Sequence, residues 1–248
     1  MALILATDDH GEPEIFAALQ GEGASTGKPV AFIRTSRCNL ACTWCDTPYT
    51  WHFDDDERPH RGGVTYARKA NQVSLEVWDA ASRIAELGQE RLVITGGEPM
   101  LQAGALSEML EHLSDISPGM NIEIETNGTV KPPARLDIRI DQFNVSPKLA
   151  HSGNAAELAL IPDRLDHFAA DPRAYFKFVI AAREDVGEVL DLIATYRLNK
   201  ERVFLMAEGT SSEILRDRQQ WLAPVCLENG LRMSDRLHIH LYGDMRAT

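Results

Sequence analysis

The stretch VAFIRTSRCNLACTWCDT, residues 30–47, joins a run of apolar and β-branched residues to three closely spaced cysteines, Cys38, Cys42 and Cys45. The apolar run predicts a buried strand, so the thiols should project from a loop at its carboxyl end. Three thiolates with gaps of three and two residues can surround one soft-metal centre. A closed zinc site needs four ligands and the ferredoxin run needs a fourth cysteine, so neither fits well. A [4Fe–4S] cluster on three cysteines leaves one iron without a protein ligand, which is useful only if an exogenous molecule binds there.

Other interpretations of the cysteines stay open at this point. One is a zinc site completed by His52 or His60, and another is a set of unligated buried thiols. Cys226 lies far along the chain in a helical pattern. We expect it to be a buried apolar residue rather than a ligand.

Similar apolar runs recur along the chain and alternate with helical patterns. The expected strands are residues 30–34, 91–95, 121–126, 139–145, 175–180, 203–207 and 237–241. The expected helices are residues 75–87, 101–113, 186–196 and 213–228, the last with capping-box spacing between Thr210 and Glu213. Repeated strand-then-helix units predict an α/β fold with mainly parallel strands, either doubly wound or curved toward a barrel. In both cases functional residues gather at the carboxyl ends of the strands.

Composition sets further bounds. The 248 residues carry 25 Lys and Arg against 37 Asp and Glu, a net charge of −12, and 44% are hydrophobic. This is the composition of a globular chain, and it excludes a disordered or collagen-like one. The acidic balance argues against nucleic acid as a partner, and no signal peptide or membrane span is visible. We therefore expect a cytoplasmic protein without membrane contact, with a single domain over residues 1–248 and a polar surface insertion at about 52–71.

Two further strand ends carry polar residues. Thr95-Gly96-Gly97-Glu98-Pro99 ends the strand at 91–95, where two glycines let the backbone approach a ligand and Glu98 can pair with a ligand ammonium. Ser146-Pro147-Lys148 follows the strand at 139–145. Taken alone, the first motif could be a turn with a helix-starting proline, and the second a proline loop with a solvated lysine.

The spacing Cys-x3-Cys-x2-Cys, with Trp44 directly before the third cysteine, resembles the signature of the radical S-adenosylmethionine (SAM) superfamily. The resemblance implies that the open iron of a [4Fe–4S] cluster chelates SAM and that reductive cleavage gives a 5′-deoxyadenosyl radical. That radical performs the chemistry, so no side chain is expected as the catalytic group. An electron donor such as flavodoxin or ferredoxin is also implied. The SAM-binding residues implied are Thr95, Gly96, Gly97, Glu98, Ser146 and Lys148.

A narrower resemblance extends from residue 20 to about residue 243. Its motifs are Gln20-Gly21-Glu22-Gly23, Arg34, Cys45-Asp46-Thr47, Glu125-Thr126-Asn127-Gly128-Thr129, Ser146-Pro147-Lys148, Lys177-Phe178-Val179, Met206-Ala207-Glu208-Gly209 and Leu237-His238. Together they are similar to the 7-carboxy-7-deazaguanine synthase family of the queuosine pathway. The resemblance implies a carbon–nitrogen lyase that contracts 6-carboxy-5,6,7,8-tetrahydropterin to 7-carboxy-7-deazaguanine with loss of ammonia. It also implies an incomplete, reduced TIM-like (β/α) barrel and a homodimer.

The same resemblance implies roles for individual side chains. Gln20, Glu22 and Glu125 would bind the edge of the pterin, where a carboxylate suits a guanidine-like N–H pair. Arg34 would bind the substrate carboxylate. Thr47 would supply a hydroxyl ligand to Mg²⁺, an ion that prefers oxygen ligands. Each of these residues could instead be an ordinary loop, turn or surface strand residue.

His238 is assigned to the active site by the family comparison. Strand alternation over residues 237–241 would place His238 and His240 on one face, so both could equally be ordinary polar-face residues. The chain differs from the shortest family members in its 52–71 insertion and in a tail that continues to Thr248. This longer tail leaves open whether it reaches the active site.

Two other functions fit part of the pattern. A radical SAM activase that installs a glycyl radical on a partner protein shares the cysteine signature and the small size, although the pterin-edge residues count against it. A non-catalytic metal-binding protein would use the cluster or a zinc ion structurally. Product analysis with the carboxypterin would separate these functions.

Overall fold

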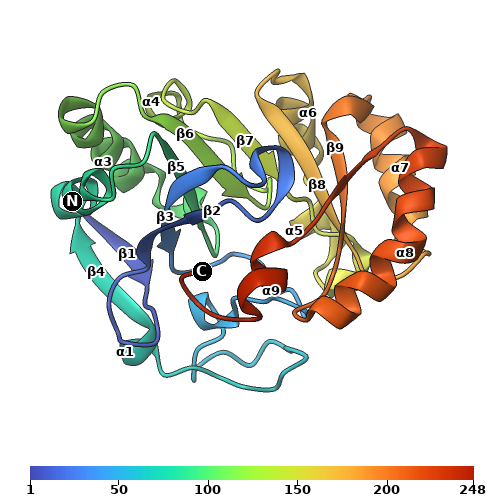
Figure 1. Ribbon diagram of the computed structural model, residues 1–248, viewed down its shortest axis with the longest axis horizontal. Helices are drawn as coiled ribbons and strands as arrows, with labels where there is room; N and C mark the ends of the chain where they lie inside the picture. The colour runs from blue at the N-terminus through green and yellow to red at the C-terminus, as the bar shows by residue number, and fades with distance from the viewer.

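A computed structural model describes residues 1–248, and a ten-stranded sheet forms its centre (Figure 1). The strands are β1 (Ala2–Ala6), β2 (Ile15–Leu19), β3 (Pro29–Thr35), β4 (Gln72–Glu76), β5 (Arg91–Gly96), β6 (Asn121–Thr126), β7 (Gln142–Val145), β8 (Ala174–Ile180), β9 (Val203–Ala207) and β10 (Arg232–Ser234). Its interior strands are nearly continuous buried runs, as in β9, where every residue is buried. Such runs are typical of parallel strands that are shielded from water.

Most of the sheet is parallel, and it does not close. Strands β3, β5, β6, β7, β8, β9 and β10 follow one another in parallel pairs. Strands β1, β2 and β4 join antiparallel at the β3 end. No pair connects β10 with β4, so the barrel is incomplete. The predicted fold class, an α/β reduced barrel with mainly parallel strands, is confirmed.

The helices are α1 (Arg68–Asn71), α2 (Val77–Glu86), α3 (Ala103–Ile116), α4 (Ala134–Asp137), α5 (Ala156–Ala159), α6 (Pro162–Ala170), α7 (Asp185–Tyr196), α8 (Ser212–Asn229) and α9 (Leu237–Tyr242). The longer helices, among them α3, α6, α7 and α8, cover the outer side of the curved sheet, whereas α9 lies at its open side, against the cavity (Figure 1). The apolar residues of the longer helices and of the sheet form one continuous buried core. None of these helices is both long enough and apolar enough to cross a membrane.

The register of the parallel strands places the two motif loops side by side. Arg34 of β3 pairs with Thr95 of β5, and Thr35 pairs with Gly96. The cysteine loop and the Gly96-Gly97 loop therefore leave the sheet at the same level. The next strands, β6 and β7, end beside them, so the site forms at the carboxyl edge as expected.

Four expected elements differ from the structure. The helix expected at 75–87 begins only at Val77, because Leu75 and Glu76 pair with β1 as part of β4. Residues 237–241 lie in helix α9 rather than in a strand, so His238 and His240 do not share a strand face as expected. The strand expected at 139–145 begins only at Gln142, because residues 139–141 turn out of the short helix α4. Helix α8 is capped by Ser211, whose hydroxyl accepts from the Ile214 amide at 3.3 Å, and not by Thr210.

The polar segment at 52–71 lies over the cysteine loop, along the lower edge of the view in Figure 1. Its middle is largely exposed, but its two ends are buried at His52, Phe53 and Asn71. The Tyr66 amide donates to the His52 carbonyl at 3.0 Å and the Asp54 amide donates to the Tyr66 carbonyl at 3.1 Å, which joins the two sides of the segment. A further bond, from the Arg61 amide to the Thr43 carbonyl at 2.7 Å, attaches its tip to the cysteine loop.

Candidate active site

A cavity of about 340 Å³ lies at the carboxyl ends of the parallel strands. This size is within the usual range for a small-molecule site. Fourteen of the fifteen residues predicted from the sequence line it: Gln20, Glu22, Arg34, Cys38, Cys42, Cys45, Thr47, Thr95, Gly96, Gly97, Glu125, Ser146, Lys148 and His238. Residues that are more than 200 positions apart in the chain thus share one cavity.

The three cysteines line this cavity as free thiols. Burial raises the pKa of Cys38 to about 12 and that of Cys45 to about 11, and it raises the pKa of Cys42 as well. Neutral thiols are therefore favoured until a cationic centre binds and stabilises the thiolates. The Asn154 side-chain amide donates to Cys42 Sγ at 3.3 Å, the kind of contact that tunes an iron–sulfur centre. The donor set fits a [4Fe–4S] cluster on three cysteines.

The zinc alternative lacks the necessary geometry. No three His, Cys, Asp or Glu side chains gather closely enough to hold a single metal ion. The Nδ1 of His52 bonds the Val64 carbonyl at 2.9 Å, and the Nε2 of His60 bonds the Cys45 carbonyl at 2.9 Å. Both histidines therefore hydrogen-bond to backbone carbonyls of the loops, and neither completes a zinc site.

The Gly96-Gly97 backbone packs directly against the chain that leads into the cysteine loop. A Cβ at Gly96 would overlap Thr35, and one at Gly97 would overlap the Arg37 carbonyl. The φ of Gly96 is also +133°, a conformation that side chains rarely adopt. These two glycines allow the two loops to meet at the cavity wall.

Glu98 is the one predicted residue that does not line the cavity. Its carboxylate is fully buried and accepts from the Met100 amide at 3.0 Å, the Asn127 amide at 2.7 Å and the Thr126 hydroxyl at 2.9 Å. These bonds occupy it and hold the loops after β5 and β6 together. In this structure Glu98 thus positions the two loops, and its pairing with a ligand ammonium stays a prediction.

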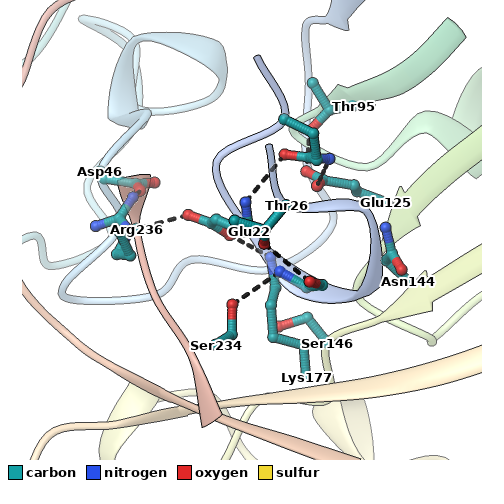
Figure 2. Close-up of polar contacts among 12 residues, drawn as sticks. Glu22, Thr26, Asp46, Thr95, Glu125, Asn144, Ser146, Lys177, Ser234 and Arg236 are labelled. Carbon is teal, nitrogen blue, oxygen red and sulfur yellow. Dashed lines mark hydrogen bonds and ion pairs between the residues drawn. The ribbon is translucent and has the colours of Figure 1, made fainter. Parts of the chain in front are cut away.

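Gln20 and Glu125 share a hydrogen-bonded network at the cavity floor. The Gln20 amide donates to Glu125 Oε1 at 3.2 Å and to Glu123 Oε1 at 3.3 Å. The Thr95 hydroxyl donates to Glu125 Oε2 at 2.8 Å (Figure 2). Glu123 was not singled out from the sequence, where it reads as an inward strand residue of β6. Its place beneath Gln20 depends on a contact between distant segments.

Arg34 is oriented by a second buried carboxylate that the sequence did not indicate. Its Nε lies 2.8 Å from Glu14 Oε2, and Glu14 also accepts from the Tyr49 hydroxyl at 3.1 Å. Burial raises the pKa of Glu14, and the charge of Arg34 opposes that rise. The ion pair uses the Nε of Arg34, which leaves the two terminal nitrogens for a ligand carboxylate.

Four charged side chains form a connected group in the site, of which three are largely buried and Asp46 is exposed (Figure 2). Glu22 is bonded by Lys177 through one oxygen and by Arg236 through the other, and Arg236 also bonds Asp46. Burial would raise the pKa of Glu22, but Lys177 and Arg236 hold it well below its usual range. Lys177 and Asp46 belong to motifs noted in the sequence. Arg236 belongs to none, and no sequence signal separates it from a surface arginine.

Thr47 lines the cavity one residue after Asp46, with its hydroxyl 3.7 Å from Cys45 Sγ. A single hydroxyl fits a Mg²⁺ ion that takes its other ligands from substrate and water, because Mg²⁺ keeps several waters and needs few protein oxygens. The neighbouring Asp46 bonds Arg236 through its Oδ2.

Helix α9 and the tail complete the wall of the cavity. His238 lies against Gly21, and its Nε2 is 3.9 Å from Glu22 Oε1. His240 points to Ser212 and Asp235 instead. The tail does reach the site: Asp244, Met245, Arg246 and Thr248 all line the cavity.

Fold and site together define the class of protein. An open (β/α) barrel with three cysteines on the loop after β3 is a radical SAM domain, and the radical SAM superfamily model matches residues 32–148. The 7-carboxy-7-deazaguanine synthase of Pyrobaculum aerophilum is 33% identical, over 94% of this chain and 95% of that protein. The Escherichia coli enzyme of the same name is 29% identical over 92% of this chain and 96% of its own. The chain belongs to the 7-carboxy-7-deazaguanine synthase family.

A solved structure agrees with this assignment. The crystal structure of QueE from Escherichia coli superposes with a TM-score of 0.67 at 26% sequence identity. The alignment covers 96% of this chain and 95% of that one, so the shared fold extends beyond the superfamily core.

Proposed function

We propose that this protein catalyses the radical SAM ring contraction of 6-carboxy-5,6,7,8-tetrahydropterin to 7-carboxy-7-deazaguanine, with loss of ammonia. One observation carries the proposal: the cysteines, the Gly96-Gly97 loop and the pterin-edge side chains Gln20, Glu22 and Glu125 line the same cavity. A cluster site without the pterin-edge residues would support only the wider class. Their combination supports this substrate.

Each part of the substrate meets a side chain of suitable chemistry. The terminal nitrogens of Arg34 bind the carboxylate, because Glu14 holds the guanidinium from its other side. Glu125 and Gln20 bind the amide-like edge of the pterin, and Glu22 adds a second carboxylate. Burial lowers the pKa of His238, so it is neutral at pH 7 and can accept or donate a hydrogen bond.

The cluster would be held by Cys38, Cys42 and Cys45, and Mg²⁺ would be bound by Thr47. SAM would be held by Ser146, Lys148 and the backbone of Thr95, Gly96 and Gly97. When bound, the cluster and SAM supply the radical that removes hydrogen from the substrate. The chain's own share is binding, orientation and exclusion of water. Leu40 and Trp51, which are almost fully buried, shield the cysteine loop.

The proposal extends to the setting of the reaction. The chain forms a single domain over residues 1–248, with residues 52–71 as a surface insertion, and it assembles as a homodimer. It acts in the cytoplasm, where thiols stay reduced. An electron donor such as flavodoxin or ferredoxin reduces it. No nucleic acid is involved, which agrees with the net charge of −12.

The test is anaerobic reconstitution followed by product analysis. We expect about four irons per chain and mass-spectrometric conversion of the carboxypterin to the deazaguanine acid. The variant Cys42→Ala should lose the iron and the product formation. The variant Cys226→Ala should keep the iron and the product formation, because the Cys226 thiol is buried in α8 away from the cavity. A redox-silent zinc protein would contradict the proposal. SAM cleavage without this product would favour a glycyl-radical activase instead.

A further inference from the structure

Arg236 is a buried arginine whose three guanidinium nitrogens are all hydrogen-bonded, and Figure 2 shows it between Glu22 and Asp46. It lies between β10 and α9, and its side chain is 7% exposed. Its Nε donates to Glu22 Oε1 at 2.9 Å, its Nη1 donates to the Gly209 carbonyl at 2.6 Å, and its Nη2 bonds the Asp46 carboxylate. One side chain thus binds three segments that are distant in the sequence.

Its partners belong to the two halves of the site. Glu22 lies in the loop before β3 and faces the pterin side of the cavity, whereas Asp46 lies between Cys45 and Thr47 on the cysteine loop. Gly209 follows β9 and anchors the guanidinium to the sheet. Because the guanidinium is planar and its donors form a rigid fork, these bonds fix Glu22 relative to Asp46.

The charge balance depends on the same residue. Glu22 and Asp46 are two carboxylates, and Lys177 and Arg236 are the two cations that bond them. Lys177 bonds only Glu22. Without Arg236, Asp46 would lose the cation that bonds it, and the nearly buried Glu22 would lose one of its two bonded cations. Loss of a cation beside a largely buried carboxylate is costly.

We propose that Arg236 is a positioning residue that holds the pterin-binding Glu22 in register with the Asp46-Thr47 end of the cysteine loop. The proposal rests on the proposed function, since it assigns Glu22 to the substrate. Arg236 does not act on the substrate itself, because its nitrogens are all occupied by protein acceptors. Its contribution is to make substrate binding and radical formation occur in one geometry.

Arg173 offers a matched control. It also engages all three guanidinium nitrogens, on Asp137, Asp171 and the Ile140 carbonyl. It lies at the start of β8 and does not line the cavity. A lysine at this position removes a comparable bonded fork without touching the site.

The experiment compares the reconstituted wild-type protein with Arg236→Lys, Arg236→Gln and Arg173→Lys. We measure iron content, melting temperature, KM for the carboxypterin, and 5′-deoxyadenosine released per deazaguanine product. For Arg236→Gln we expect unchanged iron content, a KM raised about 30-fold or more, and more deoxyadenosine released per product. Arg236→Lys should show a smaller rise, because one ammonium can serve only one carboxylate. Arg173→Lys should match the wild type in KM and in product ratio.

A double-variant cycle separates positioning from general stability. If Arg236 acts through Glu22, its loss should raise KM much less in a Glu22→Gln background. The assignment would be overturned by additive effects in the cycle or by an unchanged KM. It would also be overturned if the Arg236 variants lost iron and melted at a lower temperature while Arg173→Lys did not. A wild-type protein that does not turn over the carboxypterin would instead overturn the proposed function, and the role of Arg236 with it, before any variant is compared.

Discussion

At Gly97 the loop after β5 touches the backbone that leads into the cysteines. A Cβ there would overlap the Arg37 carbonyl, and neither backbone can move aside without disturbing β3 or β5. Gly104 in α3 is the opposite case, since its added Cβ would meet no atom. The two glycines therefore form a natural pair for testing close approach.

We expect Gly97→Ala to weaken SAM binding and to lower the iron content of the reconstituted protein, because the two loops must separate. Gly104→Ala should leave both unchanged and should alter stability by less than about 1 kcal/mol. Anaerobic SAM-binding titrations and iron analysis measure the difference. Equal behaviour of the two variants would mean that loop contact at Gly97 has no part in the site.

Residues of the site were predictable where they belong to a short motif. The spacing of the cysteines identified Cys38, Cys42 and Cys45 as ligands of one centre. The position after a predicted strand indicated the Gly96-Gly97 pair. Glu14 and Arg236 were not predictable, because their roles arise from partners that lie 20 or more positions away. Local sequence carries no record of such pairings.

At the scale of elements, continuous apolar runs identified the buried strands, whereas the short alternating run at 237–241 was assigned to the wrong element. The runs at 91–95, 121–126, 175–180 and 203–207 are strands in the structure, and the helix expected at 186–196 is α7. By contrast, the five residues at 237–241 form α9, where only Ile239 is buried. An alternating run of five residues holds too few repeats to separate the strand period from the helix period, whereas a continuous apolar run between turns still indicates a buried strand.

Tertiary contacts decide these short elements. The Leu237 amide donates to the Gly21 carbonyl at 2.9 Å, which fixes how the chain enters α9. Strands β1, β2 and β4 were also missed, since β2 and β4 are only half-buried and all three pair antiparallel at the edge of the sheet. Their position depends on β3, which supplies the partner edge.

The junction between α6 and β8 gives a prediction for stability against pH. Asp171 accepts from the Arg173 amide at 2.8 Å and from its guanidinium at 2.6 Å. Burial raises the pKa of Asp171, but these bonds outweigh it, so the folded pKa is lowered. A lowered carboxyl pKa stabilises the fold above the unfolded value, about 3.9, and this stability is lost as the pH falls through the folded value.

We therefore expect Asp171→Asn to lower the free energy of unfolding at pH 7. The gap between variant and wild type should shrink as the pH falls below about 4. Urea unfolding of both proteins at several pH values measures it. A gap that stays constant with pH would show that the Asp171 charge does not contribute.

At the scale of the whole molecule, distant segments close the side that the sheet leaves open. The tail crosses the cavity, and the Arg246 guanidinium lies 3.6 Å from the centre of the Tyr49 ring. Arg246 also bonds the Thr7 carbonyl and Asn71. The polar segment at 52–71 adds Tyr66 and Arg61, which bonds Glu208 at 2.5 Å. The segment at 52–71 was expected as a surface insertion, but the contacts that both segments make over the cavity depend on the finished barrel.

Charge is distributed unevenly between this cavity and the rest of the surface. Five acidic and five basic side chains line the cavity, so the net charge of −12 resides outside it. An anionic pterin acid approaching the molecule is therefore repelled at long range and held only on arrival. The rate at which substrate meets the cavity should therefore depend on ionic strength, because salt shortens the Debye length from about 30 Å at 0.01 M to about 8 Å at 0.15 M.

We expect kcat/KM for the carboxypterin to rise with added sodium chloride over this range, as the repulsion is screened. SAM carries a net positive charge, so its apparent affinity should stay level or fall in the same titration. A decline of kcat/KM for the pterin would show that local attraction reaches beyond the cavity. The ion pairs thus give an acidic protein a cavity lining without net charge. Substrate entry into this cavity should be slow in dilute buffer and faster at physiological ionic strength.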